Sequence, residues 1–211
     1  MDLCPLPSGA DKPMNYLAHL ILAGPHPDHR LGALLGDHLK GLQVLDTLRP
    51  ELRRGVLLHR RIDGWSDRHA VVTAFTSKLN VPWRRYAGIM LDVLFDHLLS
   101  QQWTDYSDQP LSEFAADTER LLADHRHELP DRLRRFTRWA EQASLWTRMH
   151  DRQMIQTIFD LIALRHGQAS PLKQGLDFFD QYPDQIQHAF DHLMPDLMKQ
   201  ARTFRSIGPS T

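Results

Sequence analysis

The segment from Leu91 to Leu98, LDVLFDHL, carries two aspartates and a histidine inside an otherwise apolar run. Asp92 and Asp96 are four residues apart, so in a helix they share one face, and His97 lies beside that face. Carboxylates are costly to bury without a partner, and like charges one turn apart repel each other. We therefore expect a bound divalent cation, or a catalytic role, for this pair of aspartates.

Other histidines and aspartates in the first half of the chain have similar spacing. His59 and Asp63 are four residues apart in LLHRRID, and His19 lies within an apolar segment. The whole candidate set, contributed by four predicted helices, is His19, Asp37, His59, Asp63, Asp92, Asp96 and His97. Imidazole nitrogen and carboxylate oxygen without thiolate suit Mg, Mn, Fe or Zn. Such an ion lowers the pKa of a bound water, which points to hydrolysis.

Most of these residues also have a structural explanation. Asp37 could be a turn residue at the end of a helix, and His97 could be satisfied by one hydrogen bond. His59 and Asp63 could form an exposed helical pair that contributes only a few tenths of a kcal/mol. For the two aspartates of LDVLFDHL, in contrast, the metal or catalytic interpretation is favoured, because they repel each other within an apolar run.

The composition is that of one ordinary globular domain. The 211 residues are 42% hydrophobic and 24% charged, with a formal net charge of -1, so we expect no nucleic acid partner. The single cysteine, Cys4, excludes an intramolecular disulfide and fits a reducing, cytoplasmic environment. No apolar run approaches the length of a membrane span, and the N-terminus lacks the features of a Sec signal.

Apolar residues recur at helical spacing, with Pro and Gly between the segments and no sustained strand alternation. We therefore expect an all-α, single-domain helical bundle, whose first helix has Asn15 as its N-cap. We expect residues 1–13 to be a disordered extension, 14–205 the domain, and 206–211 a flexible tail. The predicted helices span residues 15–23, 31–39, 51–63, 67–79, 82–102, 111–129, 130–146, 150–166 and 174–205.

Five segments resemble the acyl carrier protein phosphodiesterase family. They are MNYLAHLILA at 14–23, LLGDHLKG at 34–41, HRRID at 59–63, LDVLFDHLLSQQW at 91–103 and SLWTRMHDRQMIQ at 144–156. This family is similar to the HD superfamily of metal-dependent phosphohydrolases, but differs from it in motif order. The resemblance implies hydrolysis of the phosphodiester that joins 4′-phosphopantetheine to a serine of holo acyl carrier protein. It also implies a bound divalent metal ion, for which Mn²⁺ is favoured over Mg²⁺ or Fe²⁺.

The resemblance assigns roles to the candidate residues. Asp37 in LLGDH corresponds to a functional aspartate of the family, although His38 replaces the usual aromatic residue after it. Arg60 or Arg61, next to the ligand motif, would neutralise charge on the phosphoryl oxygens. The expected metal ligands are Asp37, His59, Asp63, Asp96 and His97, and Asp96 is preferred to Asp92. The expected catalytic or orienting residues are Asp37, Asp92, His19 and Arg60.

The implied partner requires local positive charge. Acyl carrier proteins are small and acidic, so an enzyme that acts on one needs a basic patch to steer their encounter. The arginines expected to form this patch are Arg53, Arg54, Arg60, Arg61, Arg84 and Arg85. Two alternatives remain: an HD-type phosphohydrolase acting on a small nucleotide or phosphoester, and a non-catalytic helical binding protein whose histidines and aspartates pair with one another.

Overall fold

In a computed structural model that describes residues 15–166 and 170–207, the chain is helical, and these residues form no strand. The all-α prediction is confirmed. The predicted extension 1–13, and residues 208–211 of the predicted tail, lie outside the described residues. The α-helices are α1 (Tyr16–Ala23), α2 (Pro27–Leu35), α3 (Pro50–Arg68), α4 (Ala70–Thr76), α5 (Trp83–Gln101), α6 (Leu111–Asp124), α7 (Asp131–Gln142), α8 (Leu145–Arg148), α9 (Arg152–His166), α10 (Gly175–Gln181) and α11 (Pro183–Ser206). Short 3₁₀ helices are η1 (Gln43–Thr47), η2 (Trp103–Asp105), η3 (Arg126–Glu128) and η4 (Pro171–Gln174).

Two prolines begin helices that the sequence pattern placed differently. Helix α2 begins at Pro27 and ends at Leu35, whereas the prediction ran from 31 to 39. The last predicted helix is divided at Tyr182, and Pro183 begins α11. Proline suits the first turn of a helix because its φ is already helical and its missing N–H would be unpaired there. As a result Asp37 lies in the turn after α2, not inside the helix.

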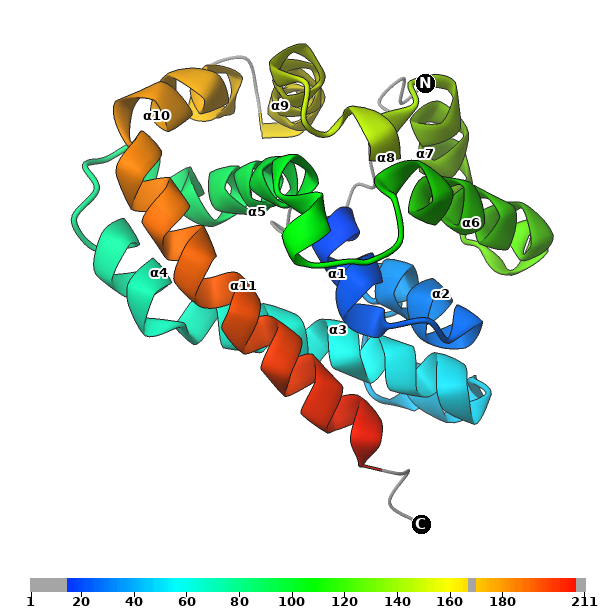
Figure 1. Cartoon of the computed structure of the whole chain (residues 1–211). Helices are drawn as coiled ribbons and strands as arrows, with labels where there is room; N and C mark the ends of the chain where they lie inside the picture. The colour runs from blue at the N-terminus through cyan, green and yellow to red at the C-terminus, as the bar shows by residue number, and fades with distance from the viewer. Residues whose placement is uncertain (1–14, 167–169, 208–211) are drawn as a thin grey trace.

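Helix α1 lies in the middle of the bundle. Figure 1 shows it in blue between α5 and α3, with α2 beside it, and it also contacts α11. Seven of its eight residues are buried. A helix that is apolar on nearly all sides belongs in the interior, where every face has a neighbour. Among the described helices, none is both long and apolar enough to cross a lipid bilayer.

The backbones of α2 and α3 touch directly. A Cβ atom added at Gly32 would lie 2.5 Å from the carbonyl oxygen of Leu52, and one added at Gly55 would lie 2.5 Å from that of His29. Only glycine permits so close an approach of two helices. The contact brings the turn that carries Asp37 next to the middle of α3.

Asp96 forms the N-terminal cap of α1 from a distant helix. Its two carboxylate oxygens accept hydrogen bonds from the backbone N–H groups of Leu17 and Ala18, each at 2.8 Å. Asn15 occupies the N-cap position, but its side chain makes no capping hydrogen bond. The Asn15 amide donates instead to Oδ1 of Asp92 at 3.4 Å. The helix N-terminus therefore compensates the buried Asp96 carboxyl, without a cation.

We expect Asp96→Ala to lower the free energy of unfolding by about 2–4 kcal/mol, because two buried N–H groups lose their acceptor at about 1–3 kcal/mol each. Asp96→Asn keeps one acceptor oxygen, so its loss should be smaller. Urea denaturation measures both. Asp124→Ala, which removes an exposed carboxylate from α6, is the control and should change stability by less than about 0.5 kcal/mol. An Asp96→Ala loss as small as this would contradict the capping role.

Burial raises the pKa of the Asp96 carboxyl from 3.8 to about 8, although the N–H groups of Ala18 and Leu17 oppose the shift. The folded state therefore keeps a proton that the unfolded state releases. This carboxyl stabilises the fold fully below about pH 4, and the contribution is lost as the pH rises towards 8. We expect the stability of the wild type, relative to Asp96→Asn, to fall between pH 5 and pH 8 in urea denaturation. If the difference in free energy of unfolding between the wild type and Asp96→Asn does not change with pH, the raised pKa is contradicted.

Candidate metal centre

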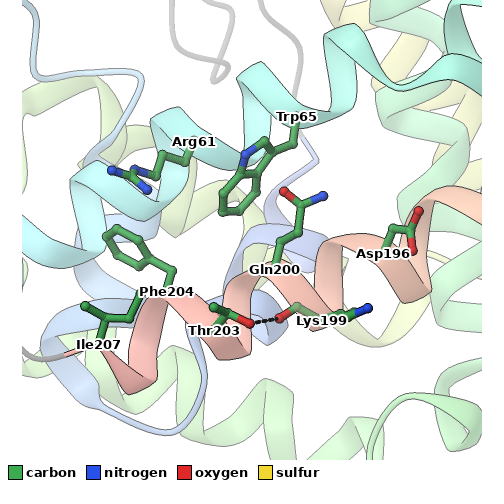
Figure 2. A pocket seen from close by; sticks show the side chains of 8 residues that line it. All are labelled: Arg61, Trp65, Asp196, Lys199, Gln200, Thr203, Phe204 and Ile207. Atoms are coloured by element: carbon green, nitrogen blue, oxygen red, sulfur yellow. Dashed lines mark hydrogen bonds between the residues drawn. The ribbon is translucent and has the colours of Figure 1, made fainter.

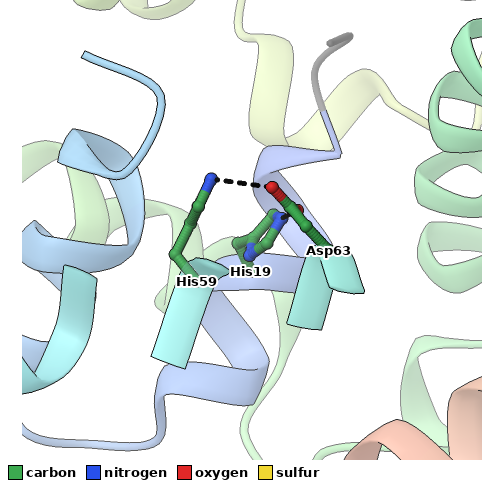
Figure 3. A group of neighbouring side chains, drawn as sticks. All are labelled: His19, His59 and Asp63. Atoms are coloured by element: carbon green, nitrogen blue, oxygen red, sulfur yellow. Dashed lines mark ion pairs between the residues drawn. The ribbon is translucent and has the colours of Figure 1, made fainter. Parts of the chain in front are cut away.

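Two helices bring two histidines and an aspartate together. His19 of α1 meets His59 and Asp63 of α3, and their ligand-capable atoms lie within 4.8 Å of one another (Figure 3). Nε2 of His19 is 3.1 Å from one oxygen of Asp63, and Nε2 of His59 is 3.5 Å from the other. The two imidazole rings are stacked, with 4.0 Å between their centroids. Asp63 thus contacts both histidines.

Asp37 completes the group from a third segment. Its Oδ1 is 3.2 Å from Nε2 of His59, and its side chain is 25% exposed. Asp37 and Asp63 therefore contact the same ring nitrogen. The structure brings together four residues of the predicted set, which are His19, Asp37, His59 and Asp63.

The tautomer of His59 is fixed by its other nitrogen. Nδ1 donates a hydrogen bond to the carbonyl oxygen of Ala33 at 2.7 Å. In a neutral ring this leaves a lone pair on Nε2, which faces the oxygens of Asp37 and Asp63. A lone pair and two carboxylates are all acceptors, so a proton or a metal ion must lie among them. A backbone carbonyl that orients a histidine in this way is a common feature of metal sites.

His19 is a buried histidine without a hydrogen bond. It is 0% exposed, and within the described structure neither ring nitrogen has a hydrogen-bond partner. Its Nε2 lies 3.1 Å from Oδ1 of Asp63, a contact that is an ion pair when the ring is protonated. Buried polar atoms are nearly always paired. The unpaired nitrogens, together with two nearby carboxylates, fit a divalent metal that takes nitrogen and oxygen ligands.

Burial and neighbouring charges shift the pKa values of the cluster residues in different directions. Burial lowers the pKa of His19, as does the charge of His59, against the opposing effect of Asp63. For His59, burial acts downward, but Asp37 and Asp63 raise the pKa above its ordinary value. Burial acts upward on Asp37, yet His59 brings the pKa of that carboxyl below its ordinary value. Asp37 is therefore ionised at neutral pH, and a metal ion at Nε2 of His59 would compete with a proton there.

Two further residues set the geometry of the cluster. A Cβ atom added at Gly36 would lie 2.2 Å from the His59 ring, so only glycine leaves room for the imidazole there. Nη2 of Arg60 donates to the carbonyl oxygens of Leu39 and Gly41, the latter at 3.1 Å. Arg60 thereby secures the loop that follows Asp37. In this structure it is a positioning residue, and its expected contact with phosphoryl oxygens stays a prediction.

The comparison with family models matches residues 14–197 to the acyl carrier protein phosphodiesterases. The chain belongs to the acyl carrier protein phosphodiesterase family. The protein of that name from Salmonella dublin is 33% identical over 195 residues, which cover 89% of this chain and 97% of the relative. The one from Klebsiella pneumoniae subsp. pneumoniae gives the same values. No solved structure matches. The predicted family is confirmed, and the likeness to HD phosphohydrolases stays a prediction.

The structure does not bring Asp96 and His97 to the cluster of His19, Asp37, His59 and Asp63. Both oxygens of Asp96 accept backbone N–H groups of α1. Nδ1 of His97 donates to the carbonyl oxygen of Met149 at 2.7 Å, and its Nε2 is 3.2 Å from the amide of Gln101. The polar atoms of Asp96 and His97 are thus engaged elsewhere in this structure, and their expected role as metal ligands stays a prediction. The catalytic role expected of Asp92 stays a prediction.

Arg61 lies in a groove on the other side of α3. The groove has a volume of about 370 Å³ and runs between α3 and α11 (Figure 2). Arg61 and Trp65 line it, and residues two positions from His59 and Asp63 project from the opposite side of a helix. The guanidinium of Arg61 covers the ring of Phe204 at 4.9 Å. Arg61 is thus not placed to contact a phosphoryl group at the metal centre.

Two groups near the cluster were not predicted. Tyr16, one turn before His19, is 3% exposed, and its hydroxyl has no partner in the described structure. Arg165 of α9 has two buried N–H positions without an acceptor there. Tyr16 belongs to the recognised segment MNYLAHLILA, which could have drawn attention to it. No spacing or motif in the sequence marks Arg165.

We expect Gly36→Ala to lower the activity on holo acyl carrier protein at least about tenfold, because the new methyl group displaces the His59 ring, and small misplacements of site groups are costly. The backbone at Gly36 is ordinary helical, with φ -52° and ψ -41°, so the fold should remain. Gly88→Ala is the matched control, since a Cβ there would meet nothing within 4 Å. Equal activity of the two variants would contradict this positioning role.

Proposed function

We propose that this protein hydrolyses the phosphodiester between 4′-phosphopantetheine and a serine of holo acyl carrier protein, using a divalent metal at His19, Asp37, His59 and Asp63. One observation carries the proposal. Two imidazoles and two carboxylates from three segments converge so that their acceptor atoms face one another, in a chain of the acyl carrier protein phosphodiesterase family. Such a convergence requires a proton or a metal ion among the acceptor atoms, and a metal ion suits phosphoester hydrolysis.

The residues of the cluster have distinct roles. Hydrogen bonding of Nδ1 to the Ala33 carbonyl directs Nε2 of His59 towards the metal position. Asp63 contacts both histidines, and Asp37 adds a second negative charge from the loop that Arg60 secures. A bound ion, Mn²⁺ by the family resemblance, supplies Lewis acidity and lowers the pKa of a water. In the net reaction water gives a hydroxyl to phosphorus and a proton to the serine oxygen, as the bond between phosphorus and that oxygen breaks.

The basic patch for the carrier is also a proposal, and several of its expected members are partly engaged within the molecule. Arg53 lies 3.3 Å from Asp46. Arg54 donates to backbone carbonyls at the C-terminal end of α11, and Arg60 donates to the loop after Asp37. Arg84 and Arg85 are exposed in the first turn of α5. We propose that these two arginines contribute most of the attraction to an acidic carrier.

The test uses purified protein stripped of metal with a chelator and then supplied with Mn²⁺, Mg²⁺ or Fe²⁺. Loss of the prosthetic group from holo acyl carrier protein, followed by mass spectrometry, should require added metal. His19→Ala and Asp63→Asn should each lower kcat/KM at least about 100-fold, as removal of metal-site groups does, and should lower bound metal. Asp124→Asn, an exposed carboxylate, is the control.

Three outcomes would count against the proposal. Hydrolysis in the absence of any metal would exclude the metal centre. An intact carrier, together with hydrolysis of a small nucleotide or phosphoester, would favour the HD-type alternative. Protein that binds no metal, and has no activity on either substrate after metal is added, would favour a helical binding protein.

A further inference from the structure

Arg165 presents two buried hydrogen-bond donors that have no acceptor. The atoms are Nε and Nη2, and within the described residues neither has a partner. Burying a charged group without partners is among the costliest arrangements in a protein. Arg165 lies in the last turn of α9. We therefore looked for a ligand that these two donors would accept.

The two donors share one edge of the guanidinium. The N–H groups of Nε and Nη2 are parallel and lie in one plane, which is the geometry that engages two oxygens of a phosphate or carboxylate at once. A single carbonyl or hydroxyl acceptor would leave one donor unpaired. The ligand that fits this edge is an oxyanion.

A second unpaired donor, the Tyr16 hydroxyl, interacts electrostatically with both Asp37 and Arg165. The Tyr16 hydroxyl is buried and has no partner in the described structure. Burial raises the pKa of Tyr16, the charge of Asp37 raises it further, and that of Arg165 lowers it. Because such effects decline with distance, the phenol is near the cluster aspartate and near the arginine. Nε2 of His38, next to Asp37 in the chain, is likewise buried and unpaired.

The arginines expected to meet the phosphoryl group are engaged elsewhere. Arg60 donates to the loop carbonyls of Leu39 and Gly41, and Arg61 covers Phe204 on the far side of α3. The side chains of the cluster are acceptors, so only a bound ion there could meet the anionic oxygens of a substrate. Hydrogen-bond donors to these oxygens would come from another element, and α9 has two that are unpaired among the described residues.

We propose that Arg165, through Nε and Nη2, binds the non-bridging oxygens of the substrate phosphodiester, with the Tyr16 hydroxyl as a further donor. The identity of that phosphodiester rests on the proposed function, whereas the oxyanion site itself does not. Arg165 holds the phosphoryl group beside the metal centre and offsets its negative charge.

The first experiment compares Arg165→Met and Arg165→Lys with wild type. Binding of inorganic phosphate to the Mn²⁺-loaded protein is measured by calorimetry, and kcat and KM are measured for holo acyl carrier protein. Arg165→Met should weaken phosphate binding at least tenfold and lower kcat/KM at least 100-fold. Arg165→Lys should be intermediate, because it keeps the charge without the fork. Mn²⁺ affinity should be unchanged in both.

Two further variants separate binding from folding. Arg120→Met removes an exposed arginine of α6 that pairs only with Asp117 in the described structure, and should leave phosphate binding unchanged. Tyr16→Phe removes only the unpaired hydroxyl, so its melting temperature should equal or exceed that of the wild type. Its phosphate affinity should nevertheless fall severalfold. If Arg165→Met does not fold, the phosphate affinities of Arg165→Lys and Tyr16→Phe, compared with that of the wild type, test the same donors.

The outcomes distinguish this inference from the proposed function. Phosphate binding that depends on Arg165, without hydrolysis of any carrier, would support the oxyanion site and refute the carrier substrate. Carrier hydrolysis and phosphate binding that are unchanged in folded Arg165→Met would overturn the oxyanion site and leave the proposed function intact. Absence of phosphate binding in the wild type would also overturn it.

Discussion

The hydrogen bonds between Asp96 and the first turn of α1 hold the helix that brings His19 to His59 and Asp63. Helix α1 has eight residues, which is too short to be stable in isolation. Its N-terminus is held by a carboxyl that lies 79 residues further along the chain, and His19 directly follows the two residues whose N–H groups are capped. Together with the direct contact of α2 and α3, this cap places ligands from three segments in one small volume.

Local spacing was sufficient for part of the fold and part of the site. Helical periodicity identified the all-α class, and the four-residue interval placed His59 and Asp63 on one face of α3. The same reasoning did not predict the partners that Asp96 and His97 have in the structure, because a buried carboxylate or imidazole can be satisfied by a cation, a helix N-terminus or a carbonyl group. Spacing along one helix does not distinguish these partners, since the choice depends on which distant backbone packs against it.

The positions of Arg60 and Arg61 next to His59 in the sequence suggested that one of them contacts the phosphoryl group. Arg60 and Arg61 follow His59 directly, yet successive residues of a helix point about 100° apart. One reaches the loop after Asp37 and the other faces the groove towards α11. The donor edge suited to an anion comes from α9 in the second half of the chain. Helix-to-helix packing, which no local pattern records, determines that pairing.

The glycine contact between α2 and α3 also bears on motion in this enzyme. Where two backbones touch, no layer of side chains is present that could change rotamers and allow the helices to slide. The two helices therefore move as one stiff body, and Asp37, His59 and Asp63 travel with it. The positions of these three residues relative to one another therefore depend on the contact between α2 and α3, and not on rotamer changes in a layer of side chains between the two helices.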